Sequence, residues 1–181
     1  MEKHYILYLI GTPGTGKYTI SQELAKSGYV VCDNQLINNV IFTLGQYDGF
    51  VPIPDSAWAA IRKIRDIAIN FIEDQIDKNY VLTNVLSESI GDRKIYEQVE
   101  KMAANRGAVF VPVKLLISKE ENLKRVVQLS RKERWKTINP KDIELELPLI
   151  TISHSNYLEM DVTNMSVPKA AKKILEHVAS L

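Results

Sequence analysis

The residues that most directly suggest chemistry lie in the stretch GTPGTGKYT, which runs from Gly11 to Thr19. Gly11, four further residues, and then Gly16 and Lys17 form the pattern of a phosphate-binding loop. Such a loop aims backbone N–H groups and a lysine ammonium at the phosphates of a nucleotide. We therefore expect a nucleotide site whose cofactor-binding residues are Thr12, Pro13, Gly14, Thr15, Gly16, Lys17, Tyr18 and Thr19.

Tyr18 departs from this pattern, because a serine or threonine normally follows the lysine and its hydroxyl holds the Mg²⁺ of the bound nucleotide. The phenol oxygen of a tyrosine lies too far from the backbone to take that coordination position. Mg²⁺ nevertheless keeps several waters and binds largely through the phosphates of its nucleotide. We expect ATP and Mg²⁺ as cofactors, with no protein ligand assigned to the metal except Asp33 acting through water.

The composition limits the classes of partner. The chain has 181 residues with a net charge of +1, so it has no overall field that would recruit nucleic acid or an anionic membrane. Its apolar runs are all too short to span a bilayer. The single cysteine, Cys32, suits a reducing compartment. We expect a cytoplasmic protein, monomeric or homodimeric, that acts on a small molecule and binds neither nucleic acid nor membrane.

Short apolar segments alternate with amphipathic ones along the whole chain. The apolar segments, which are rich in β-branched and aromatic residues, are predicted to be buried strands over 5–10, 29–33, 80–86, 108–117 and 157–162. The amphipathic segments are predicted to be helices over 17–27, 35–44, 55–78, 92–106, 119–129 and 167–180. This alternation predicts one α/β domain over 1–181, with a parallel sheet covered by helices on both faces.

Four stretches together resemble small P-loop kinases such as shikimate, gluconate and adenylate kinases and chloramphenicol phosphotransferase. These stretches are GTPGTGKYT, VCDNQLINN, RKERWK and LEMDVTNMSVPKAAKKILEHV. The resemblance covers nearly the whole chain, and its most specific motif is the phosphate loop. In detail, the chain is similar to a shikimate-kinase-like branch of these kinases. The resemblance implies a three-layer P-loop NTPase fold with a five-stranded parallel sheet in the order 2-3-1-4-5, a substrate-binding insertion at about 35–78 and a lid at about 125–142.

Asp33 is the main candidate on the acceptor side. It stands at the end of the strand predicted over 29–33, and α/β proteins bind ligands at the carboxyl ends of their strands. A carboxylate there can orient an acceptor hydroxyl and take its proton, which is also the role that the resemblance implies. Alternatively, Asp33 only caps the helix that follows. Asn34, next in the chain, is a further candidate for substrate binding.

Three more residues are substrate candidates. Arg62 and Arg65 lie three positions apart on one predicted helix and could grip an anionic or hydroxylated acceptor. The alternative is an ordinary solvated helix face. Asn84 stands near the end of another strand, where an acidic residue would hold Mg²⁺ through water in related proteins. It is a second sign, after Tyr18, of an unusual metal site.

The basic stretch between Lys124 and Lys136 is the expected lid. In the kinases that the chain resembles, arginines of this region stack on adenine and neutralise the transferring phosphoryl group, and charge stabilisation is most of what a protein contributes to that reaction. Arg131 and Arg134 are therefore predicted to be catalytic, together with Lys17 and Asp33. The resemblance also implies that adenine lies against the segment 161–166.

Two functions remain open from the sequence. The first is an ATP-dependent kinase that phosphorylates a hydroxyl of a small molecule, which Asp33 and the basic lid favour. The second is a nucleotide-binding module or weak ATPase without a transfer reaction, which Tyr18 and Asn84 favour. A guanine-specific switch is disfavoured, because the chain has no N-K-x-D segment to read that base.

Overall fold

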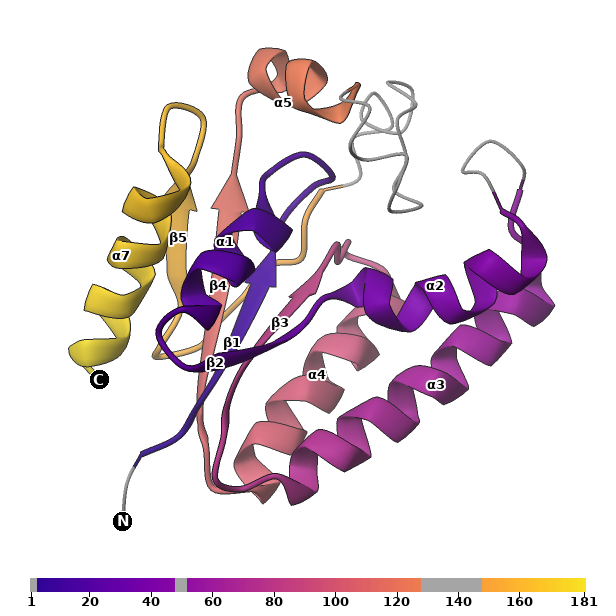
Figure 1. The fold of residues 1–181 in the computed structure, drawn as a ribbon, viewed down its shortest axis with the longest axis horizontal. Coiled ribbons are helices and arrows are strands. Elements are labelled where there is room, and N and C mark those ends of the chain that lie inside the picture. Colours follow the sequence, from indigo (N-terminus) through magenta and orange to yellow (C-terminus); the bar gives the residue numbers. More distant parts are fainter. Residues whose placement is uncertain (1–2, 48–51, 128–147) are drawn as a thin grey trace.

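The computed structural model describes residues 3–47, 52–127 and 148–181. Five parallel strands form its sheet, in the order β2-β3-β1-β4-β5. They are β1 (Tyr5–Ile10), β2 (Tyr29–Cys32), β3 (Asn79–Asn84), β4 (Val109–Leu116) and β5 (Leu158–Asp161). The fold class and the strand order expected from the sequence are confirmed (Figure 1).

The helices follow the predicted segments with small shifts at their ends. They are α1 (Lys17–Ala25), α2 (Asn34–Gly45), α3 (Asp55–Asp74), α4 (Ile90–Asn105), α5 (Lys119–Val126) and α7 (Val167–Ala179). The largest difference is in α3, which was expected to continue to residue 78. The guanidinium of Arg106 donates to the carbonyl oxygens of Gln75 and Lys78, so the chain turns there towards β3.

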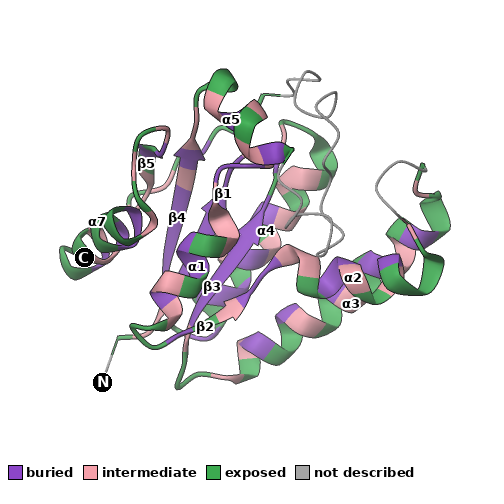
Figure 2. Cartoon of the chain, turned by 45° about the horizontal axis from the view of Figure 1, so that its top comes forward, coloured by how far each residue is buried: buried purple, intermediate pink, exposed green. Residues whose placement is uncertain are grey.

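The sheet separates two apolar cores, because successive side chains of a strand point to opposite faces. Ile6, Tyr8 and Ile10 of β1 pack on one face with residues of α2, α3 and α4. Leu7 and Leu9 pack on the other face with residues of α1 and α7. The strands β1, β3 and β4 are mostly buried in Figure 2, whereas the edge strands β2 and β5 are partly exposed and the helices expose their outer sides. This three-layer packing leaves the carboxyl ends of the strands to form a site.

Helices α2 and α3 lie side by side and extend away from the sheet (Figure 1). The aromatic rings of Phe42 and Trp58 meet edge to face between them, with centroids 5.9 Å apart. The two helices fall within the region 35–78, where a substrate-binding insertion was expected. Its role in binding, like the division of the chain into an insertion and a lid, stays a prediction.

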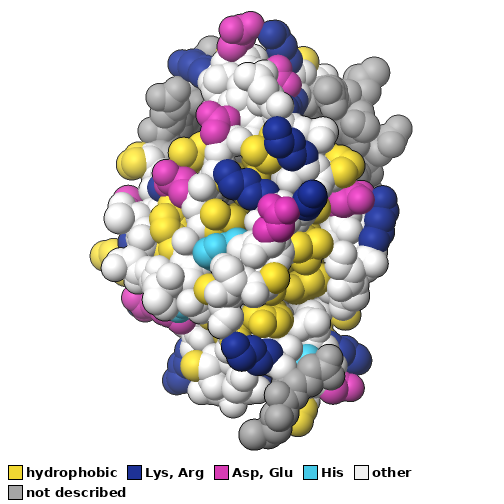
Figure 3. All heavy atoms as spheres, turned by 90° about the vertical axis from the view of Figure 1, so that its left-hand side faces the viewer, with side chains coloured by type: hydrophobic (Ala, Val, Ile, Leu, Met, Phe, Trp, Pro, Cys, Tyr) yellow, Lys and Arg dark blue, Asp and Glu magenta, His cyan; other side chains and the backbone are white. Residues whose placement is uncertain are grey.

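The face that carries α7 and β5 mixes both signs of charge, as Figure 3 shows. Lys172 and Glu176 on α7 lie 3.7 Å apart, one turn from each other. No helix among the described residues has the length and apolarity that crossing a bilayer requires.

Candidate active site

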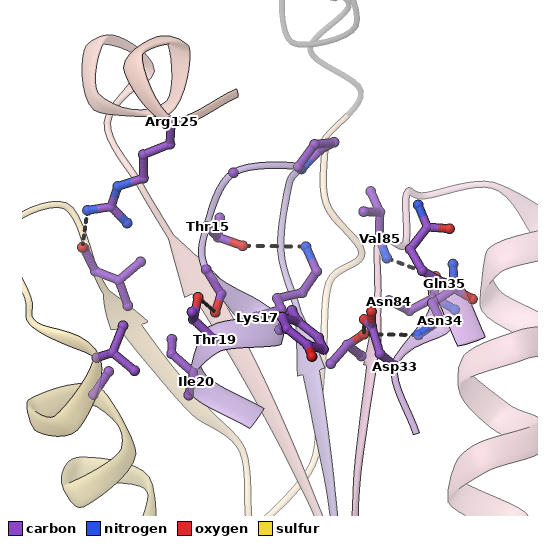
Figure 4. A pocket seen from close by; sticks show the side chains of 18 of the residues that line it. Thr15, Lys17, Thr19, Ile20, Asp33, Asn34, Gln35, Asn84, Val85 and Arg125 are labelled. Atoms are coloured by element: carbon purple, nitrogen blue, oxygen red, sulfur yellow. Dashed lines mark hydrogen bonds between the residues drawn. The ribbon is translucent and has the colours of Figure 1, made fainter. Parts of the chain in front are cut away.

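A cavity with a volume of about 600 Å³ opens at the carboxyl ends of the central strands. It extends from the ends of β2 and β3, across the loop after β1, to helix α5 and the start of α7 (Figure 4). Its lining residues are Pro13, Gly14, Thr15, Gly16, Lys17, Tyr18, Thr19, Ile20, Asp33, Asn34, Gln35, Thr83, Asn84, Val85, Glu121, Arg125, Val162, Met165, Val167 and Ala170. All the predicted cofactor-binding residues except Thr12 therefore line one cavity.

The loop between β1 and α1 has the backbone that a phosphate cradle needs. Gly14 and Gly16 have φ angles of 96° and 85°, in the left-handed region that favours glycine. Gly16 is also the N-cap of α1, so the N–H groups of the first helical turn and the positive end of the helix dipole face the loop. This geometry fits a bound anion.

The ammonium of Lys17 lies within the loop. It donates to the carbonyl oxygens of Gly11 at 2.6 Å and Thr12 at 2.9 Å, and it lies 3.4 Å from the hydroxyl of Thr15. These contacts hold the charge at the floor of the cavity, where a phosphate would meet it. The local residues thus fit the phosphates of a nucleotide.

The residues present offer little to a metal ion. Tyr18 lines the cavity where a short hydroxyl is usual. The amide of Asn84 is engaged at both ends, since its oxygen accepts from the N–H of Val85 at 2.8 Å and its nitrogen donates to the hydroxyl of Tyr8 at 3.2 Å. No cluster of three acidic, histidine or cysteine side chains suited to a metal occurs among the described residues. Asp33 is the carboxylate that lines the cavity on this side.

Asp33 occupies the N-cap position of α2, but its side chain makes no capping hydrogen bond. Instead, the hydroxyl of Thr83 donates to its Oδ1 over 2.5 Å, while the same hydroxyl accepts from the backbone N–H of Asn34 at 3.1 Å. The capping alternative considered for Asp33 is therefore not how the structure uses its carboxylate. Thr83, at the end of β3, orients it towards the cavity.

Arg65 and Arg62 have different environments. Arg65 is buried, and it donates to the amide oxygens of Asn34 at 3.1 Å and Asn38 at 3.5 Å. Burial lowers the pKa of its guanidinium. Arg65 thus stands behind Asn34, which lines the cavity. Arg62 is exposed, and the structure does not bring it to the cavity.

The opposite end of the cavity is apolar and lies below helix α5. Val162, Met165 and Val167 line it. Arg125 extends over this end, with its Nε 2.8 Å from Glu121 and its Nη2 donating to the carbonyl oxygens of Val162 and Thr163 at 3.3 and 3.0 Å. A nucleotide base is flat and largely apolar on its faces. It would fit between this apolar wall and the guanidinium of Arg125.

Several lining residues were not assigned a role from the sequence. Arg125 lay within the basic stretch but received no role, because its partners are distant in the sequence. Thr83 gave no local signal, because its partner Asp33 is 50 positions away. The predicted catalytic residues Arg131 and Arg134 lie outside the described residues, so their role stays a prediction.

Comparisons with known proteins show the fold. No family model matches the chain, and no curated protein matches its sequence. A candidate kinase from Chloroflexus aurantiacus is similar in structure, with a TM-score of 0.70, 16% identity and coverage of 99% of this chain and 98% of the other. Shikimate kinase from Acinetobacter baumannii in complex with shikimate has a TM-score of 0.56, 17% identity and coverage of 99% and 95%. APS kinase from Mycobacterium tuberculosis in complex with AMPPNP and APS has a TM-score of 0.58, 15% identity and coverage of 99% of both chains.

These proteins are P-loop small-molecule kinases, and their structures are matched over nearly the full length of each chain. The protein therefore has the α/β fold of P-loop small-molecule kinases, as its phosphate loop and strand order indicated. At this level of identity the likeness concerns the fold, and the chemistry has to be argued from the residues of the site.

Proposed function

We propose that this protein is an ATP-dependent phosphotransferase that acts on a hydroxyl group of a small molecule. The observation that carries the proposal is the order of the groups along one cavity. The phosphate loop with Lys17 lies in the middle, the apolar wall below Arg125 lies on one side, and the carboxylate of Asp33 lies on the other (Figure 4). This is the order of base, phosphates and acceptor that a transfer requires.

The reaction assigns a role to each side. Lys17 and the loop N–H groups bind the β- and γ-phosphates and stabilise the charge that develops on them. The acceptor oxygen forms a bond to the γ-phosphorus while the bond from that phosphorus to the bridging oxygen of ADP breaks. Asp33 orients the acceptor hydroxyl and takes its proton, so the products are a phosphate ester and ADP. Arg131 and Arg134 are proposed to neutralise the transferring group.

Mg²⁺, when bound, would neutralise part of the negative charge of the nucleotide phosphates. The side chain of this chain that fits it is Asp33, through water, because Tyr18 has no hydroxyl near its backbone and the amide of Asn84 is engaged at both ends. We propose a metal site that depends more on the nucleotide, and less on protein ligands, than is usual for this loop.

The acceptor is proposed to bind beside Asp33 and Asn34. Arg65 holds the side chain of Asn34 and places a buried positive charge behind it, with only amide oxygens as its hydrogen-bond acceptors among the described residues. The positive potential there favours an acceptor that carries negative charge or several hydroxyl groups. Asn84 lies between this pocket and Tyr8. It is proposed to contribute to acceptor binding by shaping the floor of the pocket.

The second candidate function is a nucleotide-binding module or weak ATPase, which the poor metal site favours. One experiment separates the two. The protein is incubated with ATP, Mg²⁺ and pools of hydroxylated metabolites, and both ADP and the phosphorus products are followed, the latter by ³¹P NMR. A phosphate ester that forms only with one acceptor supports the transferase. ADP with inorganic phosphate, at a rate that no pool changes, supports the ATPase. The variant Lys17→Ala measures any contaminating activity.

A further inference from the structure

The buried face of helix α5 contacts the back of the phosphate loop. Two side chains of this face, Asn122 and Val126, are buried. A Cβ atom built on Gly14 would lie 2.1 Å from Oδ1 of Asn122 and 3.1 Å from Cγ2 of Val126. Any side chain at position 14 would therefore collide with the helix, and the positive φ angle of Gly14 disfavours one as well. The loop and the helix fit closely because position 14 is glycine.

Asn122 is the polar group in this contact. It is 3% exposed, and its Nδ2 donates to the hydroxyl of Thr12 at 3.2 Å. Its Oδ1 has no donor among the described residues. A buried carbonyl oxygen without a donor costs free energy that a leucine of similar size would not cost. A residue that violates a packing rule in this way is expected at functional positions more than in an ordinary core.

The same helix also reaches the other end of the cavity. Arg125 follows Asn122 by three positions, and residues at that spacing share one side of a helix. Asn122 contacts the loop at Thr12 and Gly14, whereas Arg125 contacts the carbonyl oxygens of Val162 and Thr163. One turn of α5 thus connects the wall around the phosphates with the wall around the base.

We propose that Asn122 is a positioning residue that holds the phosphate loop in its binding conformation and ties it to helix α5. The inference rests on the proposed nucleotide site and adds a residue to it. Asn122 does not touch the nucleotide; it acts through Thr12 and Gly14. Because it acts on the loop, its loss weakens binding of the phosphates themselves, whereas loss of Arg125 weakens binding only of ligands that carry a base.

The test compares two ligands, ATP and inorganic tripolyphosphate, by calorimetry. Asn122→Leu keeps the volume and removes the polar atoms. We expect it to raise the Kd of both ligands by the same factor of about 10, which is the change expected from the free energy of one hydrogen bond. The Tm should not fall. Arg125→Ala is the contrast, and it should raise the Kd of ATP alone. A purely structural role for Asn122 would lower the Tm and leave both Kd values of the folded protein unchanged.

A second pair of variants covers the case in which Asn122→Leu fails to fold. Thr12→Val removes the hydroxyl that Asn122 contacts and should raise both Kd values, whereas Thr12→Ser keeps the hydroxyl and should restore parental binding. If the Kd values of Asn122→Leu lie within twofold of the parental values, the inference about Asn122 is overturned but the proposed function is not. If Asn122→Leu does not fold, the same criterion applies to Thr12→Val. A parent protein that binds neither ligand overturns the proposed function as well.

Discussion

The hydroxyl of Thr83 donates a hydrogen bond of 2.5 Å to the carboxylate of Asp33, across the ends of two neighbouring strands. The same hydroxyl accepts from the N–H of Asn34, which fixes its direction. The carboxylate is thereby held with one oxygen engaged by Thr83. We infer that Thr83 positions the proposed base in the same way that a second group orients the base of other catalytic sites.

Thr83→Val should lower acceptor-dependent turnover by about tenfold, because it removes a hydrogen bond to a charged group that contributes about 1.5 kcal/mol or more. The Kd of ATP should stay within twofold. Thr83→Ser keeps the hydroxyl and serves as the matched control, with turnover near that of the parent. Equal turnover in the valine and serine variants would show that the hydroxyl has no role in transfer.

Asp33→Asn should lower acceptor-dependent turnover by about 10²-fold or more, as expected when a positioned base is lost. The affinity for ATP should be nearly unchanged, because the carboxylate lies beyond the phosphate loop. Steady-state turnover and calorimetric ATP binding are the two measurements. A variant that transfers at the parental rate would remove Asp33 from the mechanism and leave its hydrogen bond with Thr83 as a structural contact.

Lys17→Ala should abolish ATP binding or reduce turnover severely, because the ammonium is the one side-chain charge within the stretch from Gly11 to Thr19. The effect should fall on ATP and on tripolyphosphate alike. Circular dichroism checks that the variant is folded, which we expect because the hydrogen bonds of the lysine to the carbonyl oxygens of Gly11 and Thr12 are local to the loop. Unchanged affinity and turnover would refute the phosphate-loop assignment.

Tyr18→Thr should restore a short hydroxyl to the position after Lys17 and tighten binding of Mg-ATP relative to metal-free ATP. The measurement is the Kd of ATP with and without Mg²⁺, for the parent and the variant. Tighter Mg-ATP binding with lower acceptor turnover would indicate that the tyrosine ring also contacts the acceptor. If the parent already depends strongly on the metal and the variant does not differ, the tyrosine does not weaken the metal site.

Stability should fall as the pH rises through the range from 9 to 11. Burial raises the pKa of the Cys32 thiol from 9.0 to about 11, so the unfolded chain releases this proton at a lower pH than the folded one. Deprotonation then favours unfolding, by about 2 kcal/mol at a pH of about 10.5. Urea unfolding of the parent and of Cys32→Ala, which lacks this group, measures the difference. Parallel pH profiles of the two proteins would contradict the assignment.

The strand order followed from the resemblance to small P-loop kinases, and the role of Asp33 stays a proposal. The phosphate loop and the position of Asp33 at the end of a strand could be predicted because each depends on local pattern. The contact between Asp33 and Thr83 could not, because it depends on register: Cys32 pairs with Leu82 in the sheet, which places the next residue of each strand side by side. Helical spacing similarly suggested that Arg62 and Arg65 act together, yet one is exposed and the other is buried. The boundary between the buried and the exposed side of α3 falls between these two arginines. The spacing of residues in the sequence does not predict where that boundary lies.

The contacts of α5 show the same limit. Asn122 and Arg125 meet the loop and the segment after β5 only because the end of β4 sets α5 above both. The residues next to them in the sequence do not indicate these contacts. The partner of Asn122 lies 110 positions away and that of Arg125 lies 38 positions away.

The central position of β1 in the sheet has a consequence for biosynthesis. Tyr5 pairs with Val109 and Ile6 pairs with Tyr80, so β1 precedes its partners in β3 and β4 by 74 and 104 residues. On the ribosome, this strand emerges before both neighbours and has no partner until β3 and then β4 have been translated. The entropy cost of closing such long loops comes before any free energy is gained from strand pairing. This order of events slows folding. We expect the nascent chain to present the apolar strand YILYLI for several seconds, as a binding site for chaperones and a source of aggregation when synthesis stalls.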